Sequence, residues 1–243
     1  MSFISFIQKR GLWFPRSLNQ AEFQQLYQAG VRDFRGCKFL DVDLSPYDVS
    51  VLDLRHSDLT KVRNLANILA QLQSGKINLE GVNLQGINLR QVVLNYSNLK
   101  GVQLSGSDLQ GASLKGVNLQ DASLEFACLN GADLSSARLQ NTNLNHAFLV
   151  GANLYRAQLK GANLAQANLE DANLSHSNLR FVNLTWANLQ NANLTDCCLS
   201  DTNLSFVDLD CSNFKKAKFG LVNIQGTRFS DELYLEKIPQ KID

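Results

Sequence analysis

Apolar residues recur every five positions over most of the chain. Counting in fives from Leu79 gives leucine at every step through Leu209, and the series continues with large apolar residues to Phe229. An α-helix requires apolar residues at a period of 3.6 and a β-strand at a period of 2, so neither regular element explains a period of five. A short internal repeat therefore determines the fold.

The positions around each central residue are also regular. Two residues before it stands a small or β-branched residue, and the residue directly before it is most often Asn; residues 161–179 read GANLAQANLEDANLSHSNL. In an extended segment the small residue and the central residue point to one side, while the Asn between them points to the other. Each pentapeptide is therefore predicted to form one short side and a turn, and four to close a square coil of twenty residues.

Packing explains which residues occur at each position. Successive coils are predicted to stack at about 4.8 Å, the usual spacing between strands, which gives a rod of roughly 35–40 Å for residues 77–229. A bulky side chain at the small inward position would overpack the bore at a cost of roughly 1–3 kcal/mol. The outward Asn is expected to hydrogen-bond the adjacent turn backbone. A sugar- or ice-binding Asn ladder is the alternative interpretation.

These units resemble the Ala-Asp/Asn-Leu-x-x pattern of pentapeptide-repeat proteins. ANL at residues 162–164, 167–169 and 172–174 and ADL at 132–134 match it directly, and the resemblance covers residues 77–229. It implies an all-β solenoid, a right-handed quadrilateral parallel β-helix that is especially abundant in cyanobacteria. It implies no particular activity, because a fold does not fix function.

The N-terminal part follows the register less cleanly. Residues 1–30 are predicted to be a helical cap, with a helix near residues 18–29 that begins after Ser17 as N-cap and stops at Gly30. Residues 31–59 are predicted to form the first, irregular pentapeptide coils. Capping would protect the open end of the solenoid from unwanted strand addition.

A helical insertion is predicted at residues 60–76, where the spacing of apolar residues changes to that of a helix. Leu59 and Leu79 are twenty residues apart, which is the length of one coil, so the count of five continues across the insertion. The insertion is therefore expected either to replace a coil or to bulge from one side of the solenoid. The regular β-helix is predicted to span residues 77–229. Residues 230–243 are predicted to be a tail or cap, and a homodimer through this solenoid end is a further possibility.

Turn residues change along the chain. From residue 81 to 161 the second position after the central residue is Gly at nine of seventeen steps, which suits a type II turn with positive φ. From 166 to 221 it is never Gly, so these later turns are expected to adopt other geometries. They carry four large apolar residues that form a candidate partner-binding patch, namely Phe181, Trp186, Phe206 and Leu221.

Such a patch on an otherwise polar solenoid is typical of a protein-binding surface. Trp186 and Phe206 are twenty residues apart and should be neighbours on adjacent coils, with Phe181 on the preceding corner. The alternative is that the rings lie flat on the wall or sit under the helical insertion.

Composition excludes several classes of function. The 243 residues are 44% hydrophobic, with 23 basic and 22 acidic residues and a formal net charge of +1. This balance argues against direct binding of nucleic acid or anionic membrane. No apolar run approaches the roughly 18 residues of a membrane span, so a cytoplasmic protein is expected.

Catalytic and metal-binding motifs are missing from the sequence. The three histidines belong to no recognisable motif, and the five cysteines lack C-x-x-C spacing. We expect reduced thiols that serve as small fillers, with Cys197 pointing inward and Cys198 outward. No cofactor, no metal and no enzymatic activity are predicted.

Three functional hypotheses follow. The first is a non-catalytic scaffold that presents a rigid solenoid surface to an unknown protein partner. The second, taken from the family resemblance, is a DNA mimic that binds gyrase; residues 77–229 contain eleven acidic and eleven basic residues, which disfavours it. The third, also from the resemblance, is a regulator of cell differentiation that binds a transcription factor.

Overall fold

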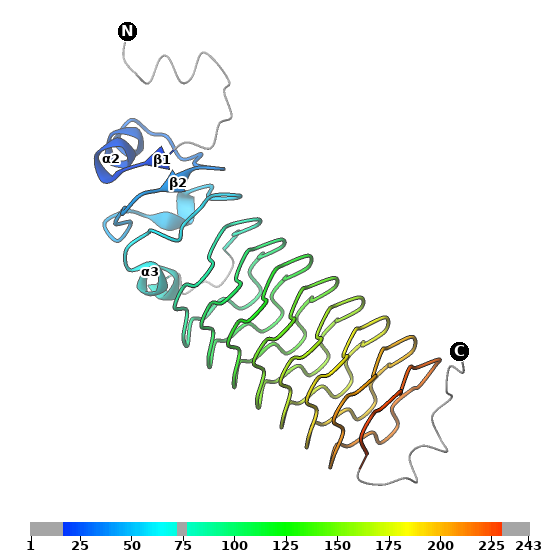
Figure 1. Cartoon of the computed structure of the whole chain (residues 1–243). Coiled ribbons are helices and arrows are strands. Elements are labelled where there is room, and N and C mark those ends of the chain that lie inside the picture. Colours follow the sequence, from blue (N-terminus) through cyan, green and yellow to red (C-terminus); the bar gives the residue numbers. More distant parts are fainter. Residues whose placement is uncertain (1–16, 72–76, 230–243) are drawn as a thin grey trace.

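Stacked square coils form a straight rod, with its N-terminal end closed by a helix (Figure 1). The computed structural model describes residues 17–71 and 77–229. Regular elements occur in the N-terminal part: strand β1 (Ser17–Leu18), helix α2 (Gln20–Gln28), strand β2 (Lys38–Phe39), 3₁₀ helix η1 (Val49–Val51) and helix α3 (Leu65–Gln71). Beyond α3, each side of a coil is a single bridge residue between two turns.

Parallel bridges join residues twenty positions apart, from Asn78 with Asn98 to Asp208 with Arg228. The backbone N–H of Leu164, for example, donates to the carbonyl of Asn183 in the next coil at 2.7 Å. Every central leucine from position 79 to 209 is at most 2% exposed. Four pentapeptides per coil and a bore filled by leucine are therefore confirmed.

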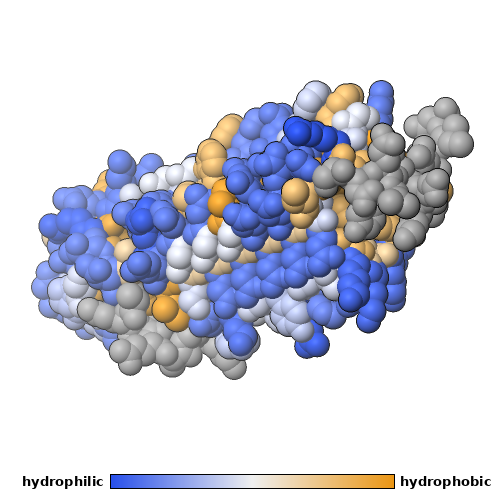
Figure 2. Space-filling view, turned by 90° about the horizontal axis from the view of Figure 1, so that it is seen from below, coloured by the Kyte–Doolittle hydropathy of each residue, from blue (hydrophilic) through white to orange (hydrophobic). Residues whose placement is uncertain are grey.

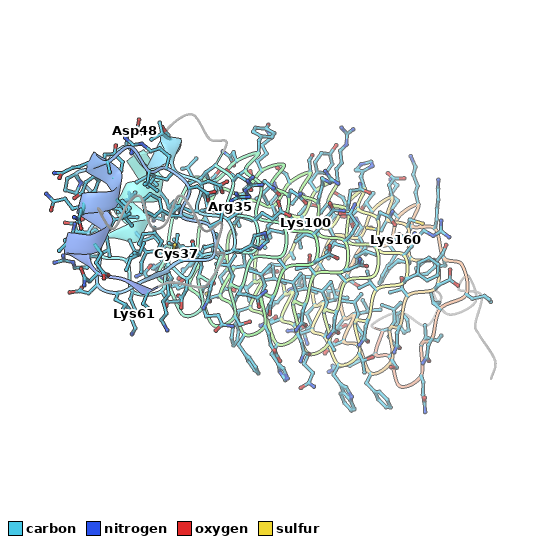
Figure 3. All side chains as sticks on the ribbon, turned by 90° about the horizontal axis from the view of Figure 1, so that it is seen from above. Arg35, Cys37, Asp48, Lys61, Lys100 and Lys160 are labelled. Atoms are coloured by element: carbon cyan, nitrogen blue, oxygen red, sulfur yellow. The ribbon has the colours of Figure 1, made fainter. Side chains whose placement is uncertain are left out.

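The coil defines four sides and four corners. The outward bridge residues start at 78 on side 1, 83 on side 2, 88 on side 3 and 93 on side 4, and each recurs every twenty residues. Corner A lies at residues 80–81 between sides 1 and 2, corner B at 85–86, corner C at 90–91 and corner D at 95–96, with the same repeat. Figure 3 shows the side chains projecting in rows along the rod.

The outward asparagines hold the turns and connect the coils. The Asn183 Oδ1 accepts from the backbone N–H of Thr185 at 3.1 Å, while its Nδ2 donates to Oδ1 of Asn163 at 3.2 Å. Asn163 repeats this contact with Asn143 at 3.3 Å. Because the amides bond one another and the backbone, the sequence prediction of a structural role is confirmed.

The expectation that the later turns adopt other geometries is wrong for residues 166–216, although Leu221 does depart from the common geometry. Every fifth residue from Gly81 to Lys216 has φ between +56° and +73°, including Trp186 at +63° and Phe206 at +56°. In each turn the third residue after the central residue donates to its carbonyl, as Ala187 does to Leu184 at 2.8 Å. Coil stacking therefore imposes one turn geometry on all residue types, at a local cost of roughly 1–2 kcal/mol where the residue is not Gly.

Helix α2 packs across the first coil. Its N-cap is Asn19, whose Oδ1 accepts from the N–H of Glu22 at 3.0 Å, while Glu22 accepts from the N–H of Asn19 at 3.1 Å. The predicted N-cap Ser17 instead lies in β1. Asn19 is a better N-cap than Ser17 because it forms a capping box with Glu22, in which each side chain accepts a hydrogen bond from the other residue's backbone N–H. Gly30 follows the helix with φ of +86°, as a stop residue requires.

An aromatic cluster joins α2 to the coils. The Phe23 ring is fully buried, with centroids 4.9 Å from Phe34, 5.8 Å from Phe39 and 5.0 Å from Tyr47. Tyr47 occupies an inward position where the repeat has a small residue, and its hydroxyl accepts from Nε2 of Gln20 at 3.4 Å. Tyr47 therefore takes the place of a small inward residue, and it contacts the helix together with Phe34 and Phe39 of the first coil.

The coil that contains the helical insertion is five residues longer than the twenty predicted from the spacing of Leu59 and Leu79. Asp58 pairs with Asn83, so Leu59 stacks over Leu84 and the coil that contains α3 spans 25 residues, not the predicted twenty. A helix rises only about 1.5 Å per residue, less than half the rise of an extended side, so more residues are needed to cross one side. Helix α3 therefore replaces one side of a coil and contributes Leu65, Ile68 and Leu69 to the core. The predicted helical residue Leu72 lies outside the described residues.

The five cysteines are thiols, and only Cys197 is a buried filler. Its Sγ donates to the carbonyl of Leu174 at 2.9 Å, and burial raises the pKa of this thiol to about 11. Cys128 and Cys198 are bridge residues that are partly exposed, and Cys211 lies exposed at corner C. The filler interpretation is therefore wrong for these three.

Cys197 is expected to resist alkylation by iodoacetamide in the folded protein near pH 8. The reactive species is the thiolate, and a thiol with a pKa near 11 is neutral there and also inaccessible. Mass spectrometry after labelling should locate the modification at exposed Cys211 first, and at Cys197 only after denaturation. Equal labelling of both cysteines in the native protein would contradict the burial of Cys197.

Candidate interaction surface

Corner B presents a column of aromatic side chains. Trp186 and Phe206 stack with centroids 4.4 Å apart and ring planes at 6°, as their twenty-residue separation predicts. Phe126 and His146 stack on the same corner at 4.7 Å and 10°. Gln166 separates the two pairs by one coil. We call these four rings and Gln166 the corner B ladder.

The aromatic patch is exposed to solvent. The exposed fraction is 59% for Trp186, 49% for Phe181, 39% for Phe206 and 54% for Leu221. These side chains are not buried under the insertion, and the Phe206 ring lies against the next coil at Gly226, where an added Cβ would be 2.5 Å from its Cδ1. Figure 2 shows one face of the rod, where hydrophilic residues form a continuous row and separate groups of apolar residues interrupt the surface.

Phe181 and Leu221 lie on corner A, across side 2 from the corner B ladder. The Phe181 ring has two cations near it, with Nζ of Lys160 at 5.6 Å and Cζ of Arg180 at 5.4 Å from its centroid. Distances below about 6 Å are typical of cation–π contacts. The four predicted residues therefore form two groups that differ in electrostatic character.

The structure adds three residues that sequence reasoning missed. Phe126 and His146 belong to the corner B ladder, and Phe148, 49% exposed, follows His146 on side 3. Their signal was present in the sequence, because positions 126, 146, 186 and 206 differ by multiples of twenty. The absence of Gly from the turns marks only residues 166–221, and Phe126, His146 and Phe148 precede that range.

The aromatic residues of corner B have the same left-handed backbone conformation as the other corners from Gly81 to Lys216. Phe126, Trp186 and Phe206 have φ of +58°, +63° and +56°, a region where bulky residues are rare. The same position is Gly in Gly86, Gly106 and Gly226. Because non-Gly residues at all four corners share this conformation, it does not distinguish the corner B ladder from the rest of the solenoid.

Charged groups in the first coils form ion pairs. The hydrogen bond from Arg35 lowers the pKa of Asp33, and that from Arg55 lowers the pKa of Asp53. Arg35 contacts a carboxylate in its own turn and another in the next coil: its Nη2 lies 2.7 Å from Oδ2 of Asp33, and its Nε lies 3.3 Å from Oδ2 of Asp53. These carboxylates are paired and partly exposed, so they are poor candidates for acid–base chemistry.

Within residues 17–71 and 77–229, no group of three or more His, Cys, Asp or Glu side chains could hold a metal ion. The same part of the chain contains no helix with the length and apolar character of a membrane span.

The five-residue repeat decides the family. The profile described as pentapeptide repeats (8 copies) matches overlapping segments that together cover residues 76–231, more than half of the chain. The chain belongs to the pentapeptide-repeat family. Membership implies a right-handed quadrilateral β-helix, and members of this family are solenoid scaffolds. A comparison with curated proteins finds no match.

Solved structures of other pentapeptide-repeat proteins are similar. HetL, involved in heterocyst differentiation regulation in the cyanobacterium Nostoc sp. strain PCC 7120, is 26% identical; the match covers 86% of this chain and 92% of HetL, with a TM-score of 0.57. Rfr23 from the cyanobacterium Cyanothece 51142 is 25% identical over 68% of this chain and 99% of its own, with a TM-score of 0.23. QnrB1, a plasmid-mediated fluoroquinolone resistance protein, is 16% identical over 91% and 95%, with a TM-score of 0.36.

Proposed function

We propose that this pentapeptide-repeat protein is a non-catalytic scaffold that binds a partner protein through the corner B ladder. The stacked, exposed pair Trp186 and Phe206 is the observation that carries the proposal. Aromatic side chains bury a large area at low entropic cost and are enriched among residues that dominate binding energy. The rigid coils hold the rings in place before a partner arrives, which reduces the ordering cost of binding.

A regulatory role is the more specific candidate. The similarity to HetL over 86% of the chain favours a protein that regulates differentiation through contact with another protein. Gyrase binding by duplex mimicry has less support, because residues 77–229 contain only eleven acidic residues and as many basic ones, whereas a duplex carries one negative charge per about 1.7 Å of its axis. A possible homodimer through a solenoid end remains a separate proposal.

Replacement of both Trp186 and Phe206 by glycine is expected to abolish partner capture while leaving the fold intact. Loss of the ring stack costs about 0.5–1.5 kcal/mol, and relief of two left-handed conformations, at about 1–2 kcal/mol each, more than offsets this loss. The full-length protein would be immobilised, and proteins bound from an extract of the source cells would be quantified by mass spectrometry. A partner should decrease about tenfold or more with the variant.

Tyr96→Gly provides the matched control. Tyr96 is also exposed, at 58%, and has φ of +60°, but it lies on corner D. It should therefore capture the partner as the wild type does. The proposal fails if every captured protein binds equally to the double glycine variant, or if Tyr96→Gly causes the same loss.

A further inference from the structure

The balanced charge of the solenoid conceals a separation across its cross-section. Corner D, side 1 and corner A together form what we call the basic half, with nine basic and four acidic residues and a formal charge of +5 between residues 77 and 229. The basic residues are Lys100, Lys115, Arg138, Arg156, Lys160, Arg180, Lys215, Lys216 and Lys218. All nine are exposed.

The remaining corners and sides have the opposite character. Corner B, side 3, corner C and side 4 form the acidic half, with two basic and seven acidic residues and a formal charge of −5. The acidic residues are Asp108, Glu125, Asp133, Glu170, Asp171, Asp208 and Asp210. Side 2, between corners A and B, carries no charged residue from Asn83 to Asn223.

Ion pairing differs between the two halves. Both arginines of the acidic half are paired: Nη1 of Arg90 lies 3.0 Å from Asp108, and Arg228 contacts Asp208 at 3.5 Å and Asp210 at 3.8 Å. In contrast, none of the nine basic residues forms an ion pair with any carboxylate of residues 17–71 and 77–229. Their charge is available to a ligand.

Cations without a carboxylate partner lie beside aromatic rings on the basic half, one ring exposed (Phe181) and one half-buried (Tyr155). Lys160 and Arg180 both approach Phe181, and Cζ of Arg156 lies 5.1 Å from the ring of Tyr155. Lys100 and Lys160 belong to the same corner A column, three coils apart along the rod (Figure 3). Two cations beside one ring repel each other, and an anion bound between them would relieve that repulsion.

We infer that the basic half is a docking surface for an acidic segment of a partner protein. The surface also contains four carboxylates, Glu80, Asp121, Asp196 and Asp201. A nucleic acid duplex carries one phosphate charge per about 1.7 Å of its axis, so it would bring phosphates against these carboxylates as well. A protein segment places its carboxylates individually, and its apolar side chains can contact Phe181 and Leu221.

This inference relies on the proposed function only in taking the partner to be a protein. It concerns a different surface from the corner B ladder, and it is tested with a defined probe, so that the two proposals can fail separately.

The test uses the full chain and fluorescein-labelled poly-L-glutamate of about twenty residues, a length of tens of ångströms that can follow the rod. Single-stranded and duplex DNA of similar length serve as competing probes, and affinity is measured by fluorescence anisotropy at two ionic strengths. Poly-glutamate should bind, more weakly at high salt, and Lys160→Gln/Arg180→Gln should lower its affinity about fivefold.

Arg90→Gln/Arg228→Gln is the matched control, because it removes the same net charge from the acidic half. It should leave poly-glutamate affinity unchanged, as should Trp186→Gly/Phe206→Gly. The inference is overturned if poly-glutamate does not bind, if the control double variant weakens binding equally, or if either DNA probe binds more tightly than poly-glutamate.

Discussion

Replacement of Phe23 by alanine is expected to lower the free energy of unfolding of the N-terminal coils by about 3–5 kcal/mol. The ring is fully buried and contacts Phe34, Phe39 and Tyr47, so its removal leaves a cavity between α2 and the first coil. Urea denaturation followed by hydrogen exchange would measure the loss, because exchange separates the first coils from the rest of the rod.

Gln24→Ala is the control for this variant. Gln24 is exposed on the same helix, and its replacement should change stability by less than about 0.5 kcal/mol. If α2 caps the solenoid, Phe23→Ala should also increase concentration-dependent association, because the backbone edge of the first coil becomes accessible. Unchanged protection of the first coils in Phe23→Ala would show that α2 does not support them.

Replacement of Leu109 by alanine is expected to destabilise the regular solenoid by about 3 kcal/mol. The side chain is 0% exposed in a bore whose other positions are already filled, so neighbouring coils have little freedom to collapse into the gap. The midpoint of urea denaturation, followed by circular dichroism, would report the change.

The adjacent residue supplies the comparison. Gln110 is exposed at the first turn position, and Gln110→Ala should leave the midpoint within about 0.5 kcal/mol of the wild type. Similar losses for Leu109→Ala and Gln110→Ala would contradict a leucine-filled bore. Because each coil contacts only its neighbours, the loss should also depend little on which central leucine is replaced.

The regular part of the fold could be predicted because its signal is local. Each pentapeptide specifies its own inward Leu and small residue and its own outward Asn, and the same arrangement recurs over the whole of residues 77–229. The N-terminal start was harder. Ser17 and Asn19 are both good N-cap residues, and only the reciprocal contact between Asn19 and Glu22 distinguishes them.

Turn geometry was mispredicted because residue preference was considered without its neighbours. Trp186 and Phe206 would not adopt positive φ in an isolated peptide, yet hydrogen bonds to the adjacent coils fix it. Glycine marks positions where a turn with positive φ causes little strain. The absence of glycine does not show that the turn has a different geometry.

The candidate surfaces were predictable only in part. The separation of twenty residues between Trp186 and Phe206 located the stack, and the same arithmetic applied to Phe126 and His146 would have completed the corner B ladder. The net charge of the chain did not indicate the basic and acidic halves, because it does not depend on which side of the coil each charged residue occupies. The proximity of Lys160 and Arg180 to Phe181 depends on side-chain conformation, which the repeat does not specify.

The 25-residue coil at α3 has a practical effect on comparison with other repeat proteins. An alignment that keeps the count of five across this junction matches Leu59 with Leu79, although Leu59 stacks over Leu84. Every residue on one flank of the junction would then be assigned a quarter-turn away from its true position. When surface residues of homologues are compared across α3, positions should therefore be matched by their bridge partners. Counting repeats assigns the correct side of the coil only among residues that lie on the same flank of α3.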